Sequence, residues 1–280
     1  MATAGLVYNM CNVHTTVTCL GYYPYGGRPK CWKRHGGGIN FMRAIAESCD
    51  VWFYTLGHRL EIDRIAKIAR QFGVGCATGI DLPRESRRGG GRLGTMPDTQ
   101  WKRRVFHERW WPGETLSCSI GQGFVQVSPL QMALVAATVA NSGKVYRPRL
   151  VQEIADPEGK PMRRFDSEIT RQVQATPEQF QLVRLGMRQA VTAGTAKACN
   201  MADIAVCGKT GSAENRGPAH GWFICFAPLE NPRIAVACVV EHGRHGATTA
   251  GPVCRAILDV FFGKKKPQEI GSGMVHVSGD

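Results

Sequence analysis

Three short strings carry hydroxyl, ammonium and carboxyl side chains that could take part in binding a substrate. The first is Lys209-Thr210-Gly211-Ser212-Ala213, where a predicted strand ends. It puts an ammonium and a hydroxyl on one strand edge, and Gly211 leaves room for another backbone alongside. These properties suit an acidic peptide end that binds as an added strand. Alone, Lys-Thr-Gly is a weak signal because unrelated chains contain it by chance.

The other two strings are Ser48-Cys49-Asp50 and Ser119-Ile120-Gly121-Gln122-Gly123. On an uninterrupted helix the side chains of Ser48 and Asp50 point about 200° apart. They therefore share a cleft only if the helix ends or opens between them. Taken alone, Ser-x-Asp usually has no function. The glycines of the third string fit a tight backbone passage before a helix, and a plain turn is the alternative interpretation.

Four further residues could bind a metal ion, namely Cys19, Cys31, His35 and Cys49. Three thiolates and one imidazole suit tetrahedral zinc, although this spacing is looser than that of standard zinc motifs. A Cys19–Cys31 disulfide and unlinked buried thiols remain alternatives. The eleven cysteines are odd in number and contain no C-x-x-C pair. We expect most of them to be buried as small hydrophobic residues.

The helices that must position these strings are visible in the pattern of apolar residues. Spacings of three and four predict helices over about 41–56 and 62–72, the second ending at a glycine. Ser128-Pro129-Leu130-Gln131 predicts a capped helix start, with proline in the first turn and glutamine completing a capping box. Thr176-Pro177-Glu178-Gln179 predicts a second start of the same kind.

The last third of the chain changes character. Short β-prone runs cover 204–207, 222–226 and 234–240 and are separated by turn residues. A closing helix is predicted over about 249–262. Helices followed by a hairpin-linked sheet and a final helix predict an α+β domain with an antiparallel sheet.

The remaining segments have weak periodicity. We expect residues 1–38 to be an irregular Cys/Gly-rich segment and 74–116 to be a long basic excursion on the surface. The domain is predicted to cover 1–263, and 264–280 to form a mobile tail.

Composition excludes several classes of protein. Apolar residues make up 43% and charged residues 20% of the 280 positions, which is too apolar for a disordered chain. No run approaches the roughly 18 apolar residues that span a bilayer, and we expect neither a signal peptide nor a transmembrane segment in this chain.

The formal net charge of +13 is concentrated in two stretches. The basic residues concerned are Arg84, Arg87, Arg88, Arg92, Lys102, Arg103, Arg104, Arg109 and Lys264-Lys265-Lys266. Such stretches could meet anionic headgroups or an acidic polymer, and a solvated loop and tail is the plainer interpretation. No nucleic-acid-binding motif accompanies the charge, so we expect no nucleic-acid partner.

Together and in this order, the three strings resemble the transpeptidase domain of penicillin-binding proteins, and most closely the class B, elongation-type enzyme that crosslinks peptidoglycan. The resemblance covers about residues 2–262. Further strings that carry it are Cys31-Trp32-Lys33-Arg34, Gly79-Ile80-Asp81-Leu82-Pro83, Gln126-Val127-Ser128-Pro129-Leu130-Gln131-Met132, Trp222-Phe223 and Phe226-Ala227-Pro228. It implies the penicillin-binding-protein/β-lactamase-like fold, an antiparallel sheet flanked by helices.

The family works through the motifs S-x-x-K, S-x-N and K-T-G. The resemblance implies that Ser48 relays a proton to the leaving D-Ala amine and that Asp50, where the wider family has Asn, orients the substrate amide. Lys209 would raise the local positive potential and Thr210 would bind the peptide carboxylate. The N–H of Ser212 would supply half of the oxyanion hole.

The S-x-x-K motif, which holds the nucleophile, does not occur in the 280 residues. Thr99-Gln100-Trp101-Lys102 has the spacing but lies in the wrong order along the chain. We therefore expect a C-terminal part of the enzyme that lacks the nucleophile helix and the N-terminal strands, is inactive alone and has an open sheet edge at 234–240. The intact remaining motifs favour this over a degenerate paralogue that only binds.

The resemblance also implies partners and a location. Ligands would be the peptidoglycan stem peptide and β-lactams, and the partner a membrane glycosyltransferase of the rod-shape machinery. The family is anchored in the inner membrane with a periplasmic catalytic domain. Catalysis needs no cofactor, and some relatives carry a structural metal, here zinc at the four residues above. The alternatives are a non-catalytic muropeptide- or β-lactam-binding module and a β-lactamase-related protein.

Overall fold

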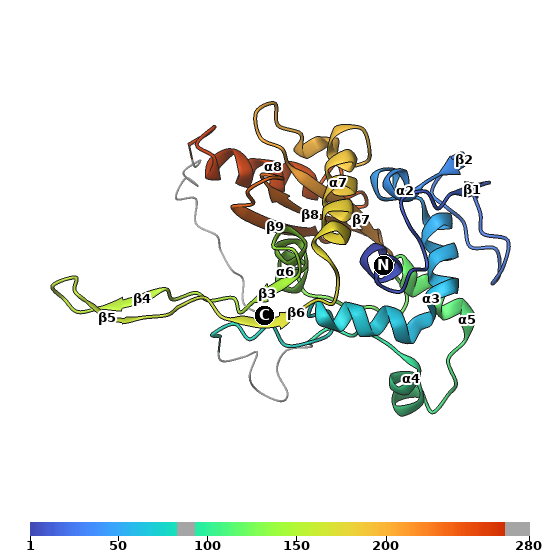
Figure 1. Cartoon of the computed structure of the whole chain (residues 1–280), viewed down its shortest axis with the longest axis horizontal. Helices are drawn as coiled ribbons and strands as arrows, with labels where there is room; N and C mark the ends of the chain where they lie inside the picture. The colour runs from blue at the N-terminus through green and yellow to red at the C-terminus, as the bar shows by residue number, and fades with distance from the viewer. Residues whose placement is uncertain (83–92, 267–280) are drawn as a thin grey trace.

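The computed structural model describes residues 1–82 and 93–266, and an antiparallel sheet lies at its centre (Figure 1). The strands are β7 (Cys207–Ala213), β8 (His220–Ala227) and β9 (Ile234–Val240), in the order β7-β8-β9. This confirms the predicted antiparallel sheet of an α+β domain. The run at 234–240 is an edge strand that pairs with β8 and with no other strand in the described residues.

Alternation along β8 divides the apolar side chains between two faces of the sheet. Phe223, Cys225 and Ala227 join a core with the closing helix α8 (Ala250–Phe261). Ile224 and Phe226 belong to the larger core on the other face. The strand signal at 204–207 was misplaced, because β7 begins only at Cys207 and carries Lys-Thr-Gly in its interior rather than at its end.

Two capped helices pack against the sheet. They are α6 (Pro129–Ala140) and α7 (Pro177–Thr192). The hydroxyls of Ser128 and Thr176 accept from the third N–H of each helix, and both reciprocal glutamine bonds form. The predicted capping boxes are therefore confirmed, and they fix where each helix begins beside the sheet.

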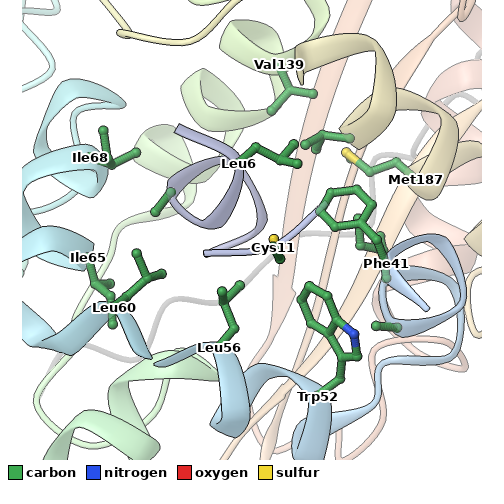
Figure 2. Close-up of a cluster of buried hydrophobic side chains, with 14 of the residues drawn as sticks. Leu6, Cys11, Phe41, Trp52, Leu56, Leu60, Ile65, Ile68, Val139 and Met187 are labelled. Carbon is green, nitrogen blue, oxygen red and sulfur yellow. The ribbon is translucent and has the colours of Figure 1, made fainter. Parts of the chain in front are cut away.

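The N-terminal segment is more regular than the sequence indicated. Helix α1 (Ala2–Val7) lies inside the molecule, and its residue Leu6 packs in the core with Leu56, Val139 and Met187 (Figure 2). Alanine, threonine and glycine at 2–5 give no amphipathic period, which explains why no helix was predicted there. Two short strands follow, β1 (Val17–Cys19) and β2 (Gly36–Ile39).

One helix predicted over 41–56 is in fact two. They are α2 (Phe41–Glu47) and α3 (Asp50–Gln71), joined through Ser48 and Cys49. Helix α3 is itself interrupted at Glu61, which has φ 61° and ψ 162°, so that a second helical stretch begins at Ile62 as predicted.

In its described residues, the excursion at 74–116 contains α4 (Thr99–Phe106) and the first part of α5 (Pro112–Ser119). Lys102 was counted in a solvated stretch, and the structure contradicts this. Its side chain is buried, with Nζ 2.6 Å from Glu114 Oε1 and 3.2 Å from Glu108 Oε2. Arg103, Arg104 and Arg109 are exposed, whereas Arg84, Arg87, Arg88 and Arg92 lie outside the described residues.

The remaining elements are short. They are β3 (Lys144–Tyr146), β4 (Glu153–Ala155), β5 (Pro161–Arg164), β6 (Ile169–Gln172) and the 3-10 helix η1 (Lys197–Cys199). The β4–β5 hairpin projects away from the rest of the molecule (Figure 1). Of the predicted tail, 267–280 fall outside the described residues. None of the described helices is both long and apolar enough to cross a lipid bilayer.

Candidate active site

The site is built around the break between α2 and α3. Asn40 caps α2 by accepting from Arg43 N–H at 2.9 Å, and Ser48 ends it in the left-handed region with φ 57°. Cys49 is extended, and Asp50 begins α3. The helix thus stops between Ser48 and Asp50, which meets the condition for both side chains to share one cleft.

Trp32 makes hydrogen bonds to the backbone carbonyls that have no helical partner at this break. Its indole Nε1 lies 3.1 Å from Glu47 O and 3.0 Å from Ser48 O. Its backbone N–H donates to Asp50 Oδ2 at 3.2 Å. Carbonyls at a helix end have no partner within the helix, so Trp32 stabilises the junction and holds the Asp50 carboxyl at the same time.

Strand β7 brings Lys209 to the serine. Lys209 Nζ donates to Ser48 Oγ at 2.6 Å and to Thr210 O at 2.9 Å. Burial lowers the pKa of Lys209 to about 8, against the weaker opposing effect of the Asp50 charge. A buried lysine near neutrality can give up a proton as well as attract an anion. Because Ser48 Oγ accepts from the ammonium, its own proton is available to another acceptor.

A second hydroxyl stands beside the strand. Thr195 Oγ1 is 2.8 Å from Thr210 Oγ1, and Thr195 N–H donates to Ala46 O at 3.0 Å. A Cβ on Gly194 would lie 2.0 Å from Ala46 O, so only glycine permits this approach. The segment after α7 therefore joins the end of α2 to β7.

The Asp50 carboxyl is partly buried. Burial, followed by the nearby Cys31 thiolate, raises its pKa to about 7, which the hydrogen bond from Trp32 N–H opposes. Both protonation states of Asp50 are therefore populated near neutral pH.

Gly211 and Ser212 continue β7 beyond Thr210. Gly211 pairs with Trp222, and a Cβ on it would lie 3.2 Å from Trp222 Cβ. Close cross-strand packing therefore also favours glycine here, and the room for a substrate that the sequence indicated stays a prediction. Ser212 O accepts from Gln122 Nε2 at 2.9 Å, so the third string also reaches this strand.

The four residues singled out as metal ligands meet at one point. The sulfur atoms of Cys19, Cys31 and Cys49 and a ring nitrogen of His35 all lie within 4.8 Å of one another, and all four residues are buried. His35 Nδ1 is 3.5 Å from both Cys19 Sγ and Cys31 Sγ. Tetrahedral zinc bonded to sulfur and nitrogen at ~2.0–2.3 Å requires ligand atoms about 3.5–3.8 Å apart. This donor set therefore fits a zinc ion.

The surroundings of this cluster also suit metal binding. His35 Nε2 lies 3.1 Å from Glu47 O, so a proton on Nε2 would leave Nδ1 free to face the sulfur atoms. A hydrogen bond from the Cys49 thiol lowers the pKa of Cys31, which favours the thiolate that metals bind. Cys49 lies between Ser48 and Asp50 in the chain, so the other three side chains of the group pack against the α2–α3 junction.

Comparison with known proteins identifies the fold and the family. The family described as "Penicillin binding protein transpeptidase domain" matches residues 1–259. The chain belongs to this family. It is of the class B elongation type that the sequence strings indicated. Mixed helices and antiparallel strands in the same arrangement occur in penicillin-binding proteins of known structure.

Individual relatives support this assignment. The chain is 32% identical to peptidoglycan D,D-transpeptidase MrdA of Acinetobacter baumannii over 99% of its own length and 43% of the relative. Pseudomonas aeruginosa PBP2, solved in complex with WCK 5153, superposes with a TM-score of 0.80 at 36% identity, covering 93% of this chain and 56% of that one.

A chain from a peptidoglycan synthase complex that coordinates polymerization and crosslinking gives a TM-score of 0.79 at 30% identity, over 96% of this chain and 46% of that one. The chain thus spans less than half the length of the curated relatives it matches.

The structure also adds residues that sequence reasoning missed. Thr195 was missed because Gly-Thr-Ala after a predicted helix is typical of an ordinary helix end. Trp32 lies in a string that carried the resemblance, but nothing indicated that its indole would bond the break. Gln122 lay in the third string without a role. Each acts through contacts between residues more than ten positions apart, which local patterns do not show.

Proposed function

We propose that this chain is the part of a peptidoglycan D,D-transpeptidase that binds the stem peptide and relays protons. The observation that carries the proposal is the 2.6 Å hydrogen bond from Lys209 Nζ to Ser48 Oγ. It joins the second and third family motifs across 161 positions of the sequence, and it lies beside the hydroxyls of Thr195 and Thr210. A cation, two hydroxyls and a strand edge together suit the carboxylate end of a peptide.

The proposed chemistry assigns one task to each group. The Thr210 hydroxyl and the Lys209 charge hold the terminal carboxylate, and Ser212 N–H polarises the carbonyl that is attacked. Ser48 donates its proton to the departing D-Ala amine and recovers one from the Lys209 ammonium. The raised pKa of Asp50 allows it to present either an acceptor or an O–H to the substrate amide. The role of Asp50 is to orient this amide.

The reaction requires an acyl-accepting serine, and we propose that it is not among these 280 residues. In the intact enzyme this serine would attack the penultimate D-Ala carbonyl and expel D-Ala, and a neighbouring stem amine would then displace the serine. These 280 residues alone are expected to bind the peptide without forming the acyl-enzyme.

A fluorescent penicillin and a D,D-peptide test this function. We expect diacetyl-L-Lys-D-Ala-D-Ala to bind reversibly in an NMR titration, benzylpenicillin to displace it, and no fluorescent band to survive denaturing electrophoresis. The Lys209→Met variant should bind the peptide at least about tenfold more weakly, because it loses a charged anchor. Equal affinity for the L-Ala-L-Ala diastereomer would refute the proposed function. A covalent band would place a nucleophile within this chain.

We further propose that a zinc ion is bound by Cys19, Cys31, His35 and Cys49. Bound there, zinc would supply structural cross-linking rather than chemistry, because four protein ligands leave no open position. The three thiolates and the imidazole would tie β1 and the 31–35 segment to the α2–α3 junction. This would hold Ser48 and Asp50 at fixed positions relative to β7.

The setting of the intact enzyme is part of the proposal. The structural relative from a peptidoglycan synthase complex supports pairing with a membrane glycosyltransferase of the rod-shape machinery. Such an enzyme would be anchored in the inner membrane and act on periplasmic peptidoglycan.

A further inference from the structure

The turn at 119–123 has no task in the function proposed above, although it reaches the site. Gly121 and Gly123 have positive φ of 79° and 68°. The N–H of Gln122 donates to Ser117 O at 3.0 Å and closes the turn on the end of α5. A Cβ on Gly123 would lie 3.2 Å from Ser117 Cβ. The turn thus presents the Gln122 side chain from a tightly held backbone.

The carboxamide of Gln122 makes two hydrogen bonds to the backbone of the β7 region. Its Nε2 donates to Ser212 O at 2.9 Å, and Glu214 N–H donates to its Oε1 at 3.2 Å. A carboxamide carries the donor and the acceptor of a peptide group. A carbonyl and the N–H two positions further along are groups that a neighbouring strand engages. The side chain therefore occupies the groups that one residue of a strand added parallel to β7 would engage.

These contacts lie on the edge of β7 that faces away from β8. Strand β7 pairs with β8 along its whole length, and no other strand pairs with it in the parts of the chain that the structure describes. The N–H and C=O of one strand residue point to the same side. The N–H of Ser212 therefore faces this open edge together with the carbonyl that Gln122 occupies.

A peptide that adds antiparallel to β7 opposite Ser212 must exchange two hydrogen bonds with it. The residue whose C=O accepts from Ser212 N–H also donates its own N–H to Ser212 O. In the proposed reaction this residue is the penultimate D-Ala, whose carbonyl is attacked. Its N–H must approach Ser212 O from the open edge of β7, which is the side from which Gln122 Nε2 already donates.

We propose that the Gln122 carboxamide is a built-in competitor that the donor peptide displaces from Ser212 O, an inference that rests on the proposed function. Without peptide, the side chain satisfies the open edge of β7 and protects it from wrong strand partners. During binding, a ligand compensates for the lost hydrogen bond only if it brings an N–H to the same carbonyl. A peptide without that N–H does not displace the carboxamide, and it binds with the hydrogen bond from Gln122 Nε2 to Ser212 O still in place.

Two variants and two ligands test this inference on the 280-residue chain. Gln122→Ala removes the carboxamide, and Gln122→Met keeps a side chain of similar length, adds no charge and cannot donate to Ser212 O. Both should bind diacetyl-L-Lys-D-Ala-D-Ala about three- to tenfold more tightly than wild type, because no internal hydrogen bond is lost. The peptide N-methylated at the penultimate D-Ala should gain nothing. Gln126→Ala, an exposed glutamine near the same turn, is the matched control and should bind as wild type does.

The outcomes separate this inference from the proposed function. In 15N-labelled wild type, the Gln122 side-chain NH2 resonances should shift as the unmethylated peptide is added. If wild type binds this peptide but both Gln122 variants bind it no better, the competitor role is wrong and the proposed function stands. An equal gain for the N-methylated peptide also overturns the inference, because Ser212 O would not be involved. No binding by any of these proteins would reject both.

Discussion

The hydroxyl oxygens of Thr195 and Thr210 are 2.8 Å apart, although one follows α7 and the other lies in β7. The backbone N–H of Thr195 also donates a hydrogen bond to Ala46 O, two residues before Ser48. Thr195 therefore connects the serine half of the site to the lysine half. We infer that it orients the Thr210 hydroxyl toward a bound carboxylate.

Replacing Thr195 by valine keeps the shape and removes the hydroxyl. Thr195→Val should weaken binding of diacetyl-L-Lys-D-Ala-D-Ala about three- to tenfold, the usual effect of one hydrogen bond near a charged group. Thr195→Ser should restore most of the affinity. The peptide with a C-terminal carboxamide should show a smaller difference in the NMR titration. If serine rescues nothing, the hydroxyl has no part in binding.

The acidity of Lys209 should be visible in stability. Its pKa is about 8 in the folded chain and 10.5 when unperturbed. Between these values the unfolded chain binds more protons, so the free energy of unfolding rises with pH across this interval and the penalty is complete below pH 8. Lys209→Met removes the penalty. Its stability relative to wild type should therefore fall by roughly 3 kcal/mol between pH 8 and 10.5.

Urea denaturation at a series of pH values measures this difference. Lys160→Met, a substitution of an exposed lysine on the β5 side of the projecting hairpin, serves as the control and should show no trend. Peptide affinity of the wild type should also weaken as pH rises through 8, because the ammonium is lost. A flat difference between Lys209→Met and wild type would show that Lys209 has an ordinary pKa.

How much of the fold and of the site could be predicted from the sequence depends on how far apart in the chain the interacting residues lie. Capped starts at Ser128 and Thr176 were predicted correctly because a capping box is complete within four residues. The meeting of Ser48 with Lys209 followed from the family resemblance and not from either string alone. The break at Ser48 was missed as a helix end, because a contact that stabilises it comes from the indole of Trp32, sixteen positions away.

Gly194 tests whether the end of α2 is held as the structure indicates. In Gly194→Ala the new Cβ would lie 2.0 Å from Ala46 O, so the end of α2 must shift. We expect a loss of about 1–3 kcal/mol in the free energy of unfolding, typical of overpacking, together with weaker peptide binding because Ser48 moves. Gly113→Ala in α5, where a Cβ meets nothing within 4 Å, should be neutral or slightly stabilising. Equal behaviour of the two variants would contradict this view of the junction.

The proposed zinc site offers a prediction that depends on neither substrate nor nucleophile. Protein purified with zinc should contain one ion per chain by atomic emission, and a chelator should lower its melting temperature, because metal binding to the folded state adds directly to stability. Cys19→Ser should lose the ion and the chelator effect. Cys76→Ser, which lies outside the cluster, should keep both. Mass spectrometry that finds a Cys19–Cys31 disulfide in the native protein, or zinc-free protein with an unchanged melting temperature, would decide for one of the two alternatives that the sequence left open.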